Sequence, residues 1–351
     1  MPPPLNCGII LTNEEPSVGL VPDGSFPFGI SPEGEKFRSR RTLSMNQKVR
    51  QNVLPVIAAF IWGTAFVAQS VGAEHVPPMT FSALRSGLAF LALLLLWVYL
   101  VHREKKLPEP PAPLDKKELL LGGLFCGLAL SGGSILQQAG LAKTAPGKAG
   151  FITALYIVIV PVLGLFLHKK APATVWVGVV LALGGLYFLC VTESLTVEPC
   201  DLYILGGSFV FSVHILLVDH YTQHVNAIKL SCMQFLVAGI VSGLGAFLTE
   251  PASWQGIREC FGSILYVGVF SGAVAFTLQI IAQKDANPTV VSLLLSLESV
   301  FAALAGAVIL GDRLSGREIL GCALMFAAVF LTQLPAPKKK SHAETAASAG
   351  L

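Results

Sequence analysis

The stretch TFSALRSGLAFLALLLLWVYLV, residues 80–101, decides the fold of this chain. Its 22 residues contain a single charge, Arg85. A helix of this length extends about 33 Å at 1.5 Å per residue, which matches the roughly 30 Å of a bilayer's hydrocarbon core. The stretch therefore predicts a transmembrane helix.

Nine further runs of the same kind lie on either side of this one. The chain is 53% hydrophobic and only 13% charged, whereas a soluble domain carries about 25% charged residues. Short polar segments, many with proline, separate the runs, as expected where helices end. The sequence thus predicts an all-α membrane protein with ten transmembrane helices. The other nine predicted spans are 53–71, 118–139, 150–167, 174–191, 202–218, 230–248, 262–282, 289–310 and 319–334.

The lysines and arginines between the spans predict the orientation. With the N-terminus in the cytoplasm, 17 of them lie in the cytoplasmic segments and 5 in the outer ones. Cytoplasmic loops of membrane proteins carry such an excess. We expect a multi-pass protein of the cytoplasmic cell membrane with both termini in the cytoplasm. The net charge of only +3, without a basic face, gives no indication of nucleic-acid binding.

The two ends of the chain differ from its middle. Residues 1–44 are rich in Pro, Gly, Ser and Glu and contain no long apolar run. They are interpreted as a disordered tail, or as a misassigned start if translation begins at Met45. Residues 336–351 are expected to form a disordered cytoplasmic tail.

An internal repeat divides the ten spans into halves, 45–200 and 201–335. A shift of 149 residues aligns Trp62 with Phe211 and Arg85 with Gln234, and a shift of 142 aligns Gln137 with Gln279 and Pro146 with Pro288. Five spans per half force the second half to insert upside down, an arrangement typical of transporters. The alternative is that apolar helices resemble one another by composition alone.

Arg85 and Glu298 are charged residues that lie well inside predicted spans, where charge is costly. Arg85 is interpreted as a cation that attracts a substrate carboxylate or phosphate or that ties two helices together. The alternative is a side chain that reaches the near interface. Glu298 lies near the middle of the ninth span. It is a candidate proton carrier, or else a structural hydrogen-bonding or ion-pairing group, for which Arg85 is one partner.

Polar and aromatic residues of other spans are candidates for binding substrate. Glutamine amides bind neutral or zwitterionic ligands, but they also join helices. A buried histidine can bind a ligand or relay protons, or be satisfied within the core. The candidates for the substrate site or cavity are Trp62, Arg85, Gln137, Tyr156, His214, Gln234 and Gln279, with Glu298 as the candidate for coupling or helix pairing.

Metal and cofactor sites are not indicated. His220 and His224 could share a helix face as ligands, but a third ligand is missing from the pattern. The seven cysteines are scattered and form no C-x-x-C pair. No metal and no cofactor is therefore expected.

Several short motifs, taken in order along the chain, resemble the drug/metabolite transporter superfamily, specifically its ten-span EamA-type members. The first span carries FIWGTAF at 60–66, the second PMTFSALR at 78–85, the ninth LESV at 297–300, and GDRL comes next at 311–314. Ser299 replaces the proline usual in the ninth span, which leaves the kink of that helix open. The resemblance covers residues 53–334 and implies a helix bundle with a central cavity between the repeats.

This resemblance also implies alternating access and transport of a small metabolite, such as an amino acid or related compound. We expect a secondary transporter, proton-coupled or an exchanger, because the chain lacks the G-x-x-x-x-G-K-[ST] loop of an ATP-driven pump. The alternatives are an intramembrane enzyme and a channel. The sequence shows neither the nucleophile–base motif that an enzyme needs nor the repeated polar filter of a channel. The expected partners are the substrate and the lipid bilayer, with a homodimer supported by the fifth and tenth spans.

Overall fold

The computed structural model describes residues 32–104, 115–169, 171–190, 198–251, 253–284, 286–310 and 314–333. The chain divides into two compact units, Met1–Met45 and Asn46–Leu351, and all ten predicted spans lie in the second unit. The first helix begins at Pro32, within the segment 1–44. Residues 1–31, the 336–351 tail and residues 311–313 of the GDRL motif lie outside the described residues, so the predictions made for the tails stay predictions.

The first half of the second unit contains five helical spans, the fourth of which is broken into two helices. The first span is the part of α1 (Pro32–His75) that follows Met45. The others are α2 (Pro78–Glu104), α3 (Lys116–Leu141), α4 (Pro146–Ala154) with α5 (Tyr156–Phe166), and α6 (Ala173–Cys190).

The second half repeats this order. Its third and fourth spans are built from successive α and π segments, and a short helix, α9 (Trp254–Glu259), precedes the third. The spans are α7 (Pro199–Tyr221), α8 (Ala227–Thr249), α10 (Phe261–Tyr266) with η1 (Val267–Ala275) and α11 (Phe276–Gln283), α12 (Pro288–Leu295) with α13 (Glu298–Ala305) and η2 (Gly306–Leu310), and α14 (Gly316–Gln333).

The helices have the length and composition of membrane spans. Eight of the spans are long and apolar enough to cross a membrane, and α6 contributes a shorter apolar helix, Ala173–Leu189. Helices α6 and α14 have 18 residues each, or about 27 Å. A helical segment thus occupies each of the ten predicted spans, and the predicted all-α membrane fold is confirmed.

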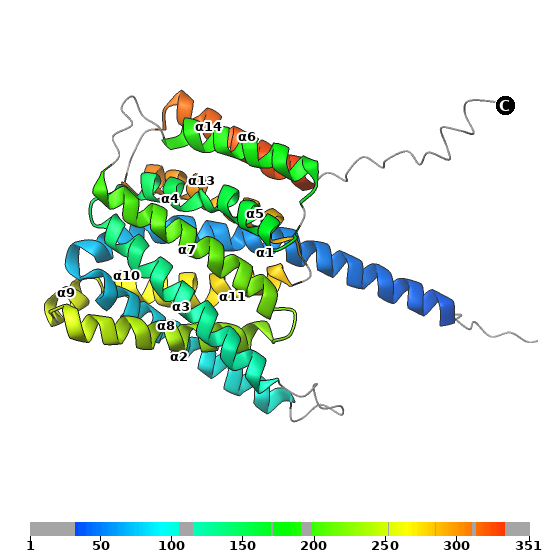
Figure 1. Cartoon of the computed structure of the whole chain (residues 1–351), viewed down its shortest axis with the longest axis horizontal. Helices are drawn as coiled ribbons and strands as arrows, with labels where there is room; N and C mark the ends of the chain where they lie inside the picture. Colours follow the sequence, from blue (N-terminus) through cyan, green and yellow to red (C-terminus); the bar gives the residue numbers. More distant parts are fainter. Residues whose placement is uncertain are drawn as a thin grey trace, which may run out of the picture. The chain divides into compact units, whose positions relative to one another are not determined.

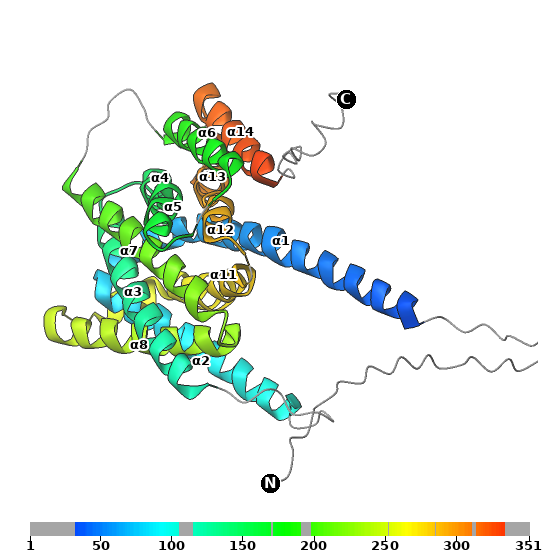
Figure 2. The ribbon, with the colours of Figure 1, turned by 45° about the vertical axis from the view of Figure 1, so that its right-hand side comes forward.

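Contacts between helices follow the two-fold pattern of an inverted repeat. Helix α2 packs on α8, and α6 packs on α14, so that each pair joins equivalent spans of the two halves. Helix α3 packs on α8, while its counterpart η1 packs on α2. Likewise α4 contacts α13 and α5 contacts α12. Figures 1 and 2 show α6 and α14 side by side at one edge of the bundle, as expected for the peripheral fifth and tenth spans.

The fourth and ninth spans break at equivalent points. The first break falls at Leu155, between α4 and α5, and the second at Ser296 and Leu297, between α12 and α13. In the ninth span the Oγ of Ser296 donates to the carbonyl of Leu293 at 2.7 Å, and that of Ser299 to the carbonyl of Ser296 at 2.8 Å. Such bonds to the preceding turn bend helices. The break therefore forms without the proline that Ser299 replaces.

The C-terminus of α5 is closed by a Schellman motif. The N–H of Lys169 bonds the carbonyl of Gly164 at 2.9 Å, and the N–H of His168 bonds that of Leu165 at 3.0 Å. His168 has a φ of 57°, the left-handed conformation that this motif requires. Glycine usually takes this position, because a side chain is strained there.

Replacing His168 by Gly should therefore stabilise the protein by about 0.5–1 kcal/mol, since glycine adopts a positive φ without steric cost. The measurement is the melting temperature of the purified protein in detergent. His168→Val is the matched variant and should lower the melting temperature, because β-branched residues are poorly tolerated at positive φ. If His168→Gly lowered the melting temperature as much as His168→Val, the assignment of a Schellman motif at His168 would be contradicted.

Candidate functional site

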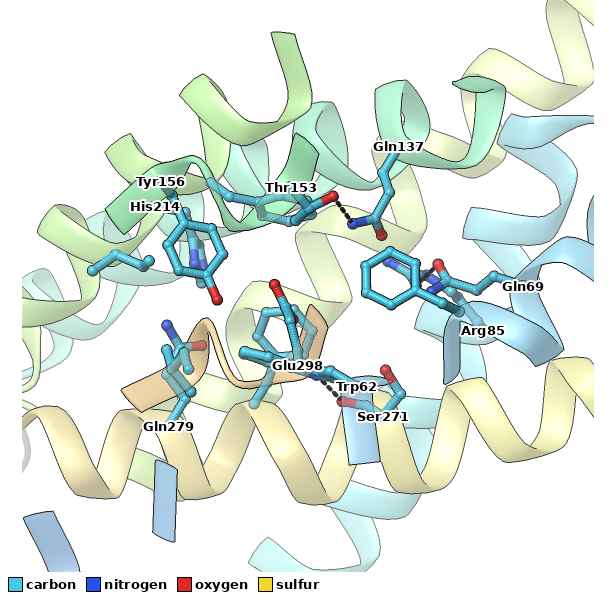
Figure 3. Close-up of a pocket in the computed structure, with 15 residues that line it drawn as sticks. Trp62, Gln69, Arg85, Gln137, Thr153, Tyr156, His214, Ser271, Gln279 and Glu298 are labelled. Carbon is cyan, nitrogen blue, oxygen red and sulfur yellow. Dashed lines mark hydrogen bonds between the residues drawn. The ribbon is translucent and has the colours of Figure 1, made fainter. Parts of the chain in front are cut away.

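A cavity lies between the two repeats, at the level of the helix breaks (Figure 3). Its empty volume is about 510 Å³, including the part open to solvent. Side chains of α1, α2, α3, α4, α5, α7, η1, α11, α12 and α13 line it. They are Trp62, Phe66, Gln69, Arg85, Gln137, Thr153, Tyr156, Phe211, His214, Ile215, Ser271, Phe276, Gln279, Leu295 and Glu298.

The residues proposed from the sequence lie at or beside this cavity. Gln234 is the one that does not line it; its side chain lies behind His214 and bonds the imidazole. The seven that line the cavity are Trp62, Arg85, Gln137, Tyr156, His214, Gln279 and Glu298.

Arg85 is held inside the bundle and does not reach the interface. Arg85 is only 6% exposed to solvent. One terminal nitrogen donates to Oε1 of Gln69 at 3.1 Å, and the other donates to the hydroxyl of Ser134. Gln69 is itself fixed, because the side chain of Gln138 donates to its backbone carbonyl at 2.9 Å. A guanidinium has five N–H donors, so these two bonds leave the group able to bind an anion.

No carboxylate of the described residues forms an ion pair with this arginine. The interaction between Arg85 and Glu298 that the sequence left open is not formed, although both side chains face the same cavity. In Figure 3 Arg85 and Gln69 lie at one side of the cavity, and Tyr156 and Gln279 at the other. In this view the cation thus lies on the side opposite to Tyr156 and Gln279.

Aromatic rings form the apolar wall of the cavity. The indole N–H of Trp62 donates to the carbonyl of Ser271, within the π segment η1, at 3.2 Å. Its ring packs against Phe276 with centroids 4.7 Å apart, and Phe276 also contacts Phe235 at 5.5 Å. π segments are frequent at functional sites. Here the π segment places a backbone carbonyl where the indole can bond it.

His214 is oriented by Gln234 from the neighbouring helix α8. The imidazole Nε2 and the amide Oε1 of Gln234 are 3.0 Å apart, and both residues are buried. The imidazole also lies edge-on to Phe276, with ring centroids 5.8 Å apart. Gln234 is therefore a residue that orients a cavity group, which is a different role from the direct contact that the sequence suggested.

The opposite side of the cavity gathers buried polar groups. Tyr156, Gln279 and Glu298 point into one space in Figure 3. The hydroxyl of Tyr156 and the carboxyl of Glu298 interact with each other. In the described part of the chain no other group bonds the hydroxyl of Tyr156, Oε1 of Gln279 or Oε1 of Glu298. Gln137, the counterpart of Gln279, is instead engaged, because its amide donates to Oγ1 of Thr153 at 3.1 Å.

The helix breaks place two of these groups. Tyr156 is the first residue after the break at Leu155, and Glu298 is the first after the break at Leu297. The two positions are 142 residues apart, the same shift that relates the spans. Equivalent breaks therefore present a phenol from one half and a carboxyl from the other.

Several cavity residues were missed by sequence reasoning. Phe211 could have been found, because the repeat aligns it with Trp62. Thr153, Ser271 and Phe276 carry no signal of their own, since small polar and aromatic residues are common in membrane helices. Their role depends on the break and on the π segment, which no residue pattern indicated.

These features define a class: a multi-pass membrane protein with two inverted repeats around a polar cavity, as transporters have. The EamA-like transporter family matches the chain twice, at residues 51–191 and 198–334. The chain belongs to this family, within the drug/metabolite transporter superfamily.

Curated relatives agree with this assignment over nearly their whole length. An uncharacterized transporter of Archaeoglobus fulgidus is 27% identical over 282 residues, which cover 79% of this chain and 84% of that protein. The uncharacterized inner membrane transporter YedA of Escherichia coli is 26% identical over 300 residues, with 81% and 92% covered. A crystal structure with 19% sequence identity shares the fold, with a TM-score of 0.67 over 83% of this chain and 99% of that one.

The position of Glu298 depends on a close contact between α1 and α13. A Cβ on Gly63 would lie 2.5 Å from Cβ of Phe301 and 2.7 Å from the backbone oxygen of Glu298. Gly63→Ala should therefore displace α13 and destabilise the protein by about 1–3 kcal/mol, the usual cost of overpacking. Gly87→Ala is the matched control, because a Cβ there meets nothing within 4 Å. The melting temperatures of the two variants test this, and equal effects would refute the contact.

Proposed function

We propose that this protein is a secondary active transporter that moves an amino acid or a related small zwitterion across the cytoplasmic membrane by alternating access. Transport is coupled to protons or to the exchange of a second substrate molecule. Arg85 binds the carboxylate of the substrate, and Glu298, with Tyr156 and Gln279, faces its ammonium group.

The observation that carries the proposal is a set of buried polar atoms around one cavity that lack a well-formed hydrogen bond to the protein. They are Nε of Arg85, the hydroxyl of Tyr156, Oε1 of Gln279 and Oε1 of Glu298, considered over the described residues. Buried polar groups almost always have partners, so each such exception needs an explanation. A zwitterion would satisfy all four, with its carboxylate on Arg85 and its ammonium group on the oxygens of Tyr156, Gln279 and Glu298.

The rest of the cavity favours a substrate that also carries an apolar group. Trp62, Phe66, Phe211 and Phe276 line it together with Leu295. Aromatic and apolar walls with a few convergent polar groups are typical of small-molecule sites. An amino acid with an apolar or aromatic side chain meets these requirements.

The two alternative functions have less support. An intramembrane enzyme needs a nucleophile beside a base, but the ring nitrogen of His214 bonds Gln234 and not a serine or cysteine. A channel needs repeated polar groups along a path, whereas this cavity holds one cation and one carboxyl among its described residues. Cytoplasmic termini and a homodimer through α6 and α14 stay predictions.

Substrates that differ in one charged group test the role of Arg85. The probes are L-phenylalanine, phenethylamine, which lacks the carboxylate, and 3-phenylpropanoate, which lacks the ammonium group. In proteoliposomes Arg85→Gln should raise KM for phenylalanine about ten- to a hundredfold, since a hydrogen bond to a charged group contributes about 1.5–3 kcal/mol. The KM for phenethylamine should change little.

Lys143→Gln is the matched control, because Lys143 is an exposed cation after the end of α3. It should leave the KM values of all three probes unchanged. Equal losses of phenylalanine and phenethylamine transport in the Arg85 variant would contradict a role in carboxylate binding. Absence of transport of all three probes by the wild-type protein would contradict the proposed substrate class.

The coupling role of Glu298 is tested by Glu298→Gln, which keeps the shape of the side chain but cannot release a proton. We expect the pH dependence of net uptake to disappear while exchange of internal for external substrate partly remains. The measurement is uptake and counterflow in proteoliposomes with imposed pH gradients. Glu74→Gln, at a carboxyl near the end of α1 and outside the cavity lining, should behave as wild type. A pH dependence that survives in the Glu298 variant would exclude this role.

A further inference from the structure

Three polar residues of α7 lie in one line along the helix. Ser208 follows Asp201 by 7 residues, and Asp219 follows Ser208 by 11. At 3.6 residues per turn these spacings are close to two and three whole turns, so the three side chains share one face. Asp201 and Asp219 are 18 residues apart, or about 27 Å, so one lies near each end of the span. Each of the two carboxylate residues is only 4% exposed, and Ser208 is fully buried.

Each of the three residues bonds the neighbouring fourth span. Near the start of α4, Nζ of Lys148 is 2.6 Å from a carboxylate oxygen of Asp201, and the hydroxyl of Thr144 donates to the other oxygen at 3.0 Å. Just beyond the end of α5, Lys169 forms an ion pair with Asp219. Between these two points the hydroxyl of Ser208 donates to the backbone carbonyl of Thr153 at 2.9 Å, beside the helix break.

The Schellman motif at the end of α5 explains how the second ion pair forms. The left-handed conformation of His168 reverses the chain direction, and Lys169 comes directly after it. A buried carboxylate is stable only when it is paired. Asp201 and Asp219 therefore hold the fourth span at both of its ends.

The interface that the repeat relates to this one, between α1 and α12–α13, has no counterpart of the two ion pairs among the described residues. The repeat aligns Asp201, Ser208 and Asp219 with Asn52, Ala59 and Ser70 of α1, and aligns Lys148 and Lys169 with Val290 and Gly311. Where α1 meets α13 the contact is one of small and apolar groups, with Gly63 against Phe301 and Ala302. No ion pair joins α1 to α12 or α13 among the residues that the structure describes.

We propose that Lys148, Lys169, Asp201 and Asp219 are positioning residues that keep α4, α5 and α7 together as one body throughout the transport cycle. The proposal rests on the proposed function. Thr153, Tyr156, Phe211 and His214 then form a constant wall of the cavity. The movement that exchanges access takes place where α1 meets α12 and α13, which carry Trp62 and Glu298.

The opposing view is that each ion pair is a gate that opens once in every cycle. Both pairs are formed in the same structure, as they would be if the cavity were closed at both ends. The two views differ in whether the distance between the fourth span and α7 changes. That distance can be measured without knowing the substrate.

The experiment uses spin labels and electron paramagnetic resonance on the full chain in lipid nanodiscs, with the native cysteines replaced. Labels at exposed positions report on the ends of the interface: Ala145 with Leu202 at one end, and Phe166 with His220 at the other. Phe60 with Leu304, 53% and 40% exposed, reports on α1 and α13 as the matched pair. Distances are compared between the otherwise native protein and the Glu298→Gln variant at several pH values.

For the label pairs Ala145–Leu202 and Phe166–His220 we expect one distance that is the same in both proteins and at every pH. For the pair on α1 and α13 we expect a shift of about 2–5 Å or a second population, in the range of helix movements in such transitions. A change at Ala145–Leu202 or Phe166–His220 would show that the ion pairs are gates and overturn the proposal. A constant distance between α1 and α13 would also overturn it.

A second set of variants tests whether the ion pair itself causes the constancy. Asp219→Asn should broaden the Phe166–His220 distance, and Lys169→Asp combined with Asp219→Lys should restore it. If the Phe166–His220 distance distribution stayed unchanged in Asp219→Asn, Asp219 would not be a positioning residue. These readouts do not depend on phenylalanine transport, so a wrong substrate class and a wrong positioning role would be told apart.

Discussion

Hydrocarbon offers no hydrogen bonds, and this constraint governs every polar group in the bundle. A charged or polar side chain at membrane depth must find its partner inside the protein. Arg85 illustrates the consequence. Two of its nitrogens are held by Gln69 and Ser134, and Gln69 is held in turn by Gln138. Three helices are thereby joined around one cation, and the cation is presented to the cavity in a defined orientation.

Helix breaks are the second place where this constraint acts. A broken helix frees backbone carbonyls, which must be bonded by other groups. In the ninth span the hydroxyls of Ser296 and Ser299 bond carbonyls of the preceding turn. In the fourth span Ser208 of another helix bonds the carbonyl of Thr153. Both breaks can then lie at membrane depth, where they direct Tyr156 and Glu298 into the cavity.

Much of the fold could be predicted from the sequence, because a membrane span needs about twenty apolar residues and the chain contains ten such runs. The candidate site was predictable where a residue was costly in lipid, as for Arg85 and Glu298, or repeated between the halves, as for Gln279. The ion pair between Lys169 and Asp219 was not predictable. Lysines near span ends serve topology in any membrane protein, and their partners depend on which helices become neighbours.

The two halves share one backbone plan but differ in where their charges lie, and the difference follows from the cavity they enclose. If the position of Tyr156 carried a second carboxyl, two like charges would face each other in a site of low dielectric, where one would have to stay protonated. A phenol opposite Glu298 leaves a single acid at the breaks. The span that carries the phenol is also the span that Lys148 and Lys169 join to α7. Sequence divergence between the repeats thus separates a constant wall, built from α4, α5 and α7, from the contact of α1 with α13, where the ionisable group lies.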